Sequence, residues 1–128
     1  MGSLVLRVND AQHLSEADDL LHDLSFDLSR ISYDAQEAVF ELVLYRSQKT
    51  RDLFSSRRHR GIGNGSFLLK ILNVASYVVN DPQGLVEHSY SRLRWTKPRS
   101  LSLTSNFPGS IDLDVSLLAL EIEEQPNP

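Results

Sequence analysis

The sequence predicts an α+β domain in which one short N-terminal helix packs on a strongly coiled, mostly antiparallel sheet. We expect about six to seven strands, arranged as a half-barrel or a sandwich. Three observations support this prediction. Helical spacing of apolar residues is confined to residues 14–23, and the rest of the chain alternates with a period of two. Two of the extended segments change phase midway, which is typical of bulged and strongly twisted strands.

Length and composition fit a single domain spanning residues 1–128. The chain is 41% hydrophobic and 23% charged, as expected for a globular protein. The absence of cysteine excludes disulfides, a thiolate nucleophile and sulfur ligands for a metal. The N-terminus does not resemble a secretory signal, and the apolar runs are shorter than the ~20 residues of a membrane span. We therefore expect a cytoplasmic protein without a membrane partner.

The first elements are a strand and a helix. Residues 4–8 form a short apolar run, and residues 14–23 have the pattern of a helix. Ser15 is a candidate N-cap, with Asp18 three positions later as in a capping box. The helix would bury a narrow apolar stripe consisting of Ala17, Leu20 and Leu21.

A bulged strand and a central strand follow the helix. In residues 24–33 the apolar positions change parity near Ser29–Arg30, which predicts a β-bulge there. A turn at residues 34–36 leads into residues 38–45, which are apolar on both faces and are expected to form a buried central strand.

The second half of the chain predicts further antiparallel strands. Residues 67–79 are expected to form one long strand, joined by a tight turn at Asp81–Gly84 to a hairpin partner at residues 85–95. Residues 100–104 form a short strand, and a turn follows at residues 107–109. The last strand, 111–123, changes parity near Leu117, and residues 123–128 are expected to be a frayed tail.

Charge is distributed unevenly along the chain. The net charge is −4, but residues 1–45 carry −7 and residues 46–60 carry +5. The basic part lies in a long loop, 46–66, that contains Arg57, Arg58 and Arg60. Its glycines fit neither a Walker loop nor a dinucleotide fingerprint. Three readings stay open for the arginines: a solvated loop, contact with an acidic protein, or binding of nucleic-acid phosphates or another anion.

A second candidate site is a polar face on the C-terminal strands. If these strands meander side by side, one parity is core and the other is polar. A solvated surface with weak charge pairs is one reading. The other is a binding surface in which Tyr90 is the aromatic anchor and Arg92 and Arg94 contact a partner. The polar parity consists of His88, Tyr90, Arg92, Arg94, Ser100, Ser102, Thr104, Asp112, Asp114 and Ser116.

Recognisable catalytic or cofactor motifs do not occur. Asp112 and Asp114, two positions apart on one strand face, should titrate alike and are unsuited to acid–base catalysis. The histidines lack the local spacing of a metal-ligand pair, and no nucleophile elbow is present. We expect no metal, no cofactor and no enzymatic activity. Among the functions considered, an enzyme whose pocket cannot be recognised from the sequence ranks last.

Residues 20–45 resemble small bacterial α+β domains, largely uncharacterised, some of which are immunity proteins of polymorphic toxin systems. The resemblance is carried by Leu21-His22-Asp23 after the helix, by Tyr33-Asp34 at the turn, and by the strand rhythm. It implies a non-enzymatic binding protein. A toxin-facing patch would then lie on the acidic helix surface formed by Glu16, Asp18, Asp19 and Asp23.

Together these observations predict a non-catalytic, protein-binding domain, of the immunity type if the resemblance holds. Its partner would be another protein or a second copy of the chain. The alternative is a nucleic-acid or anion-binding module that acts through residues 46–60.

Overall fold

The computed structural model describes residues 3–46, 66–106 and 109–125. Its α-helix and ten strands occur in the order β1 (Ser3–Val8), η1 (a 3₁₀ turn, Ala11–His13), α1 (Leu14–Leu21), β2 (Ser25–Asp27), η2 (a 3₁₀ turn, Leu28–Arg30), β3 (Ser32–Asp34), β4 (Val39–Tyr45), β5 (Ser66–Ile71), β6 (Val74–Asn80), β7 (Glu87–Thr96), β8 (Ser100–Ser105), β9 (Ser110–Val115) and β10 (Leu120–Gln125).

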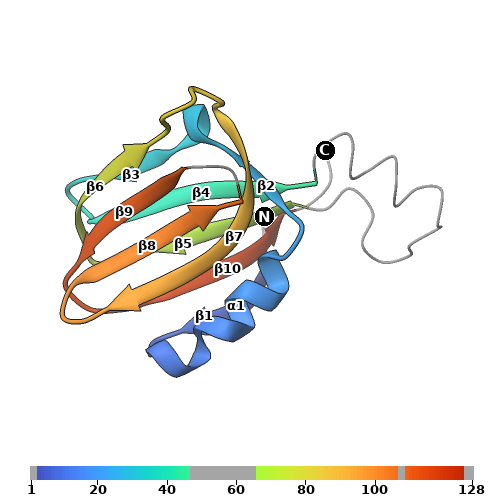
Figure 1. Ribbon diagram of the computed structural model, residues 1–128. Helices are drawn as coiled ribbons and strands as arrows, with labels where there is room; N and C mark the ends of the chain where they lie inside the picture. The colour runs from blue at the N-terminus through green and yellow to red at the C-terminus, as the bar shows by residue number, and fades with distance from the viewer. Residues whose placement is uncertain (1–2, 47–65, 107–108, 126–128) are drawn as a thin grey trace.

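The ten strands form one folded-over antiparallel sheet with the order β1-β10-β5-β4-β2-β7-β8-β9-β6, and β3 pairs with β4 off this path. In Figure 1 the front layer is β7, β8, β9 and β6, and the back layer is β4, β5, β10 and β1. The short strand β2 joins the layers because it pairs with β4 on one side and with β7 on the other. The prediction of an antiparallel α+β domain is therefore confirmed.

The core lies between the two layers. Alternate residues of each strand point inward, so rows of apolar side chains cross each layer. In the back layer one such row is Phe40, Ile71 and Leu120, and in the front layer another is Leu103 and Ile111, all fully buried. Both rows belong to one hydrophobic cluster, as expected for a single domain.

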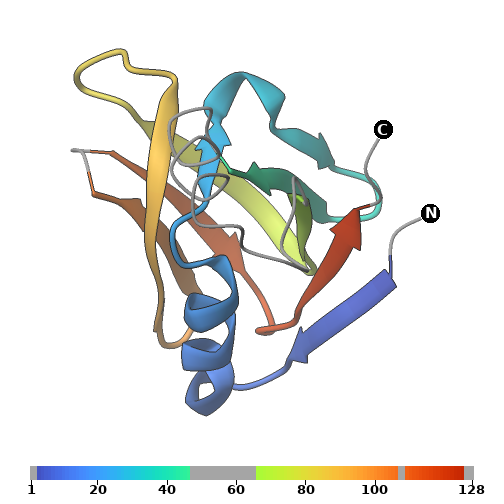
Figure 2. The same cartoon turned by 90° about the vertical axis from the view of Figure 1, so that its right-hand side faces the viewer.

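Helix α1 packs against β7 and β1 (Figure 2). Leu14, Ala17 and Leu21 form its buried stripe. The predicted Ser15 cap is wrong, because α1 begins at Leu14 and its N-cap position is His13, which makes no side-chain capping bond. Asp10 caps the preceding turn η1, where its carboxylate accepts a hydrogen bond from the His13 amide at 3.2 Å. Asp18 instead faces β7, where its carboxylate accepts from the Leu93 amide at 2.9 Å and from the Tyr90 hydroxyl.

The predicted strand number of six to seven was too low, because three predicted strands each contain two. Residues 24–33 divide into β2 and β3 at the turn η2, where a bulge was expected. Residues 111–123 divide into β9 and β10 at the expected bend near Leu117. Residues 67–79 divide into β5 and β6 at Asn73, whose φ of 60° interrupts an extended backbone.

The predicted hairpin between residues 67–79 and 85–95 is also wrong. The turn exists, since the Gly84 amide donates to the Asp81 carbonyl at 3.0 Å. However, β6 pairs with β9, so β6 and β7 lie at opposite sides of the front layer (Figure 1). The predicted frayed tail is wrong for residues 123–125, because β10 continues to Gln125 between β1 and β5, and residues 126–128 lie outside the described residues.

Candidate binding surface

The outward-pointing residues of β7, β8, β9 and β6 form a polar surface that we call the outer face. Its central row contains Arg94, Ser102, Asp112 and Val78, which are neighbours in register from strand to strand. The meander of β7, β8 and β9 was predicted, whereas the contribution of β6 was not. The flanking rows are Arg92, Thr104, Ser110 and Asn80 on one side, and Thr96, Ser100, Asp114 and Ser76 on the other.

The acidic residues of the outer face are held in fixed positions. Asp112 accepts hydrogen bonds from Ser102 Oγ at 2.9 Å, Ser110 Oγ at 3.1 Å and Asn80 Nδ2 at 2.8 Å. Asp114 pairs with Arg99, whose Nε lies 2.6 Å from its Oδ1. This hydrogen bond and the charge of Asp114 raise the pKa of the Arg99 guanidinium.

Arg92 and Arg94 are exposed on the same surface, and within the described ranges neither lies in an ion pair. The cations of the back layer, by contrast, lie in ion pairs. Lys70 Nζ lies 3.9 Å from a Glu41 oxygen and 3.7 Å from a Glu123 oxygen, and Arg7 pairs with Glu121 at 3.2 Å. The outer face therefore carries two guanidinium groups that form no ion pair with any described residue.

The outer face is hollowed near the turn that connects β7 to β8. A depression of about 520 Å³ is lined by Ser76, Val78, Asp112, Asp114 and the turn residues Lys97–Ser100. Val78 is 60% exposed there, which is unusual for a large apolar side chain. A second depression lies on the other side of the same turn, where half-buried Trp95 and exposed Leu117 contribute apolar surface.

Tyr90 does not belong to this surface, so the predicted aromatic anchor is wrong. Its side chain is 4% exposed and its hydroxyl donates to Asp18. The register between β7 and β8 shifts between Tyr90 and Arg92, and this irregularity turns His88 and Tyr90 inward while Arg92 and Arg94 point outward. Burial first, and then the Asp18 carboxylate, raise the pKa of the Tyr90 hydroxyl, which keeps it a donor.

The other predicted sites have different outcomes. Arg57, Arg58 and Arg60 lie outside the described residues. Glu16 and Asp19 on α1 and Asp23 beyond its end are exposed, but Asp18 is partly buried against β7. The four acids therefore do not form one solvent-facing patch.

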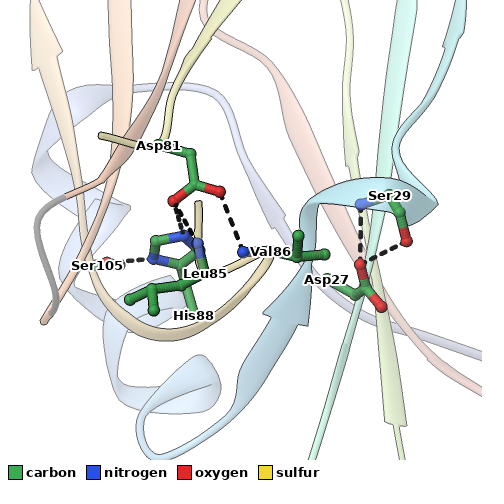
Figure 3. A network of polar contacts seen from close by, with 7 residues as sticks. All are labelled: Asp27, Ser29, Asp81, Leu85, Val86, His88 and Ser105. Carbon is green, nitrogen blue, oxygen red and sulfur yellow. Dashed lines mark hydrogen bonds and ion pairs between the residues drawn. The ribbon is translucent and has the colours of Figure 1, made fainter. Parts of the chain in front are cut away.

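Sequence reasoning missed a buried polar cluster around His88 (Figure 3). The His88 side chain is 1% exposed and stacks on Phe26, with ring centroids 5.8 Å apart. Its Nε2 lies 3.0 Å from Asp81 Oδ1 and its Nδ1 lies 2.9 Å from Ser105 Oγ. Since a carboxylate only accepts, Nε2 carries the proton, and in the neutral ring Nδ1 accepts from the Ser105 hydroxyl.

Asp81 also holds the β6–β7 loop in an unfavourable conformation. Its carboxylate accepts from the Val86 and Leu85 amides at 3.0 Å each. Val86 has φ of 65°, which is costly for a β-branched residue. The Val86 amide first, and then the Leu85 amide and His88, hold the pKa of Asp81 below its usual value.

The Asp81–His88–Ser105 connectivity resembles that of a serine hydrolase triad, but the imidazole is reversed, with Nε2 toward the acid and Nδ1 toward the hydroxyl. Neither of the two depressions described above is lined by any of these residues. The cluster instead joins the β6–β7 loop to the end of β8. A sequence signal did exist: His88 alternates with Val86 and Tyr90, and the acid that opens the turn is seven residues earlier.

Within the described residues, no group of three His, Asp or Glu side chains is arranged to hold a metal ion. No described helix is both long and apolar enough to span a bilayer. In the comparisons with known proteins, no family model, curated protein or solved structure matches the chain. The resemblance to immunity proteins stays a prediction.

Proposed function

We propose that this chain is a non-catalytic, protein-binding domain and that the outer face is its binding surface. The observation that carries the proposal is the exposure of Arg92 and Arg94 beside ordered hydroxyls and Asp112, with no ion pair to either arginine in the described part of the chain. Arginines are enriched at protein interfaces because a guanidinium offers several donors to carboxylates and carbonyls.

The arrangement of the central row supports a protein rather than a small ligand. Arg94, Ser102, Asp112 and Val78 place a cation, a hydroxyl, an anion and an apolar group across four strands. The adjoining depression is open to solvent, and the surface it exposes is mostly apolar. A protein surface with carboxylates opposite β7 and a basic or amide group opposite Asp112 would complement this row. An immunity-type role would be one form of this activity.

A capture experiment with matched variants tests the proposal. Tagged wild-type protein is used as bait in cells that naturally produce it, beside Arg92→Ser/Arg94→Ser and a control with equal charge change, Arg7→Ser/Arg30→Ser. We expect wild type and control to recover one protein in a fixed ratio. The outer-face variant should recover this protein in an amount lower by about tenfold, as expected when interface arginines are removed.

Two outcomes would contradict the proposal. Equal recovery by both double variants would remove the outer face from the interface. Recovery of nucleic acid by the wild type, lost with added salt, would favour the alternative module based on residues 46–60.

A further inference from the structure

The edge of β6 is the second surface of interest, distinct from Arg92 and Arg94. In the described part of the chain, β6 is a terminal strand that pairs with β9 alone. Every second residue of a terminal strand presents its N–H and C=O outward, so such edges tend to acquire another strand. The strand VASYVVN contains no charged residue and no proline, the features that commonly prevent pairing.

The two ends of the sheet differ in protection. Strand β1, at the other end, carries Arg7 and a register shift between Leu4 and Leu6. On β6, the backbone acceptors that a described side chain covers lie at the beginning of the strand, and the Tyr33 ring also packs edge-on against the Tyr77 ring, with the ring centroids 5.3 Å apart. The Tyr33 hydroxyl lies 2.7 Å from the Val74 carbonyl oxygen and 3.0 Å from that of Ala75. The remaining segment, Ser76–Asn80, includes Val78 and Val79, which are 60% and 36% exposed.

We propose that two copies of this chain associate through Ser76–Asn80 of β6, paired antiparallel about a two-fold axis at Val78. This register opposes Val78 to Val78, Tyr77 to Val79 and Ser76 to Asn80. Each is a favourable cross-strand pair: β-branched with β-branched, aromatic with β-branched, and hydroxyl with amide. The two-fold axis satisfies the outward backbone groups of both copies at once.

Charge also favours a second copy as the occupant. In a two-fold pair any charge near the axis meets its own like charge, and Ser76–Asn80 has none. The nearest acids of the outer face, Asp112 and Asp114, are on β9, and a whole β6 strand separates them from the axis. A charged partner strand would find no complementary charge on this edge.

Sedimentation velocity over a concentration series tests the dimer. We expect the wild-type sedimentation coefficient to rise with concentration towards that of a dimer. Val78→Lys places two lysines across the axis and should raise Kd by on the order of 100-fold, as like charges in an interface do. Leu4→Lys is the matched control: Leu4 is 50% exposed on the other terminal strand, and its variant should dimerise like the wild type.

A second experiment places opposite charges at position 78 of the two copies. Val78→Lys and Val78→Glu should each be monomeric but should form a heterodimer when mixed, while thermal unfolding shows both to be folded. A monomeric wild type at all concentrations, or dimers of Val78→Lys, would overturn the proposal. Loss of the dimer in Leu4→Lys would assign it to β1 instead. Arg92→Ser/Arg94→Ser should dimerise normally, so failure here is distinguishable from failure of the proposed function.

Discussion

At the scale of single residues, Gly109 has little room for a side chain. A Cβ built on it would lie 2.6 Å from Cε1 of His88, and that ring cannot move away because Asp81 and Ser105 hold both of its nitrogens. We expect Gly109→Ala to destabilise the fold by about 1–3 kcal/mol, the usual cost of overpacking. Urea unfolding measures this loss of stability. An unchanged midpoint would show that the His88 ring shifts to make room for the added methyl group at little cost.

The lowered pKa of the Asp81 carboxyl group predicts how the stability of the fold changes with pH. Because its pKa is lowered in the folded state, its contribution is fully present above the unfolded pKa of about 4 and is lost as the pH falls through the folded pKa. Asp81→Asn should therefore lower Tm at pH 7, and the difference from wild type should shrink in acid. A difference that stays constant down to pH 2 would show that the carboxylate charge is not the cause.

At the scale of elements, one side chain of α1 completes the edge of β7. Asp18 binds the Leu93 amide and the buried Tyr90 hydroxyl. We expect Asp18→Ala to cost about 1–3 kcal/mol, because both donors lose their acceptor. Asp19→Ala, an exposed neighbour on the same helix, should remain within about 0.5 kcal/mol of wild type. Equal effects in denaturant titrations would rule out this role for Asp18.

Sequence periodicity located the elements well but not their connections. The parity changes near Ser29 and Leu117 were detected, and both are places where one strand ends and another begins. Asn73 gave no such signal, because residues on both sides of it are apolar. The hairpin between β6 and β7 was expected because consecutive strands commonly pair. Pairing of β6 with β9 is a long-range choice that local pattern does not encode.

The same limit applies to the candidate surface. Ser102, Asp112 and Arg94 were placed on one face correctly because β7, β8 and β9 are consecutive and stay in register from Arg92 onward. Tyr90 was misplaced because one parity was assigned to the whole of residues 88–94, whereas the register shifts between Tyr90 and Arg92 and the buried parity changes with it. Val78 was missed because its neighbour across the sheet comes from a distant segment.

At the scale of the whole molecule, the uneven charge distribution tests the alternative function. The net charge is −4, so the negative charge of the rest of the chain opposes the attraction of a polyanion by the basic residues 46–60. If the chain binds protein rather than nucleic acid, wild type and Arg57→Ala/Arg58→Ala/Arg60→Ala should both pass a heparin column without retention at low salt. Retention of the wild type alone would support phosphate binding.

The pairing of β1 with β10 has a consequence for chain connectivity. Ser3 and Glu124 are opposite each other in that ladder, so the first and last strands are lateral neighbours. A short linker between these positions would bridge them without crossing the sheet, and new ends opened at the Lys97–Pro98 turn would leave every ladder intact. A circular permutant of this kind should reach the same architecture from a different starting point.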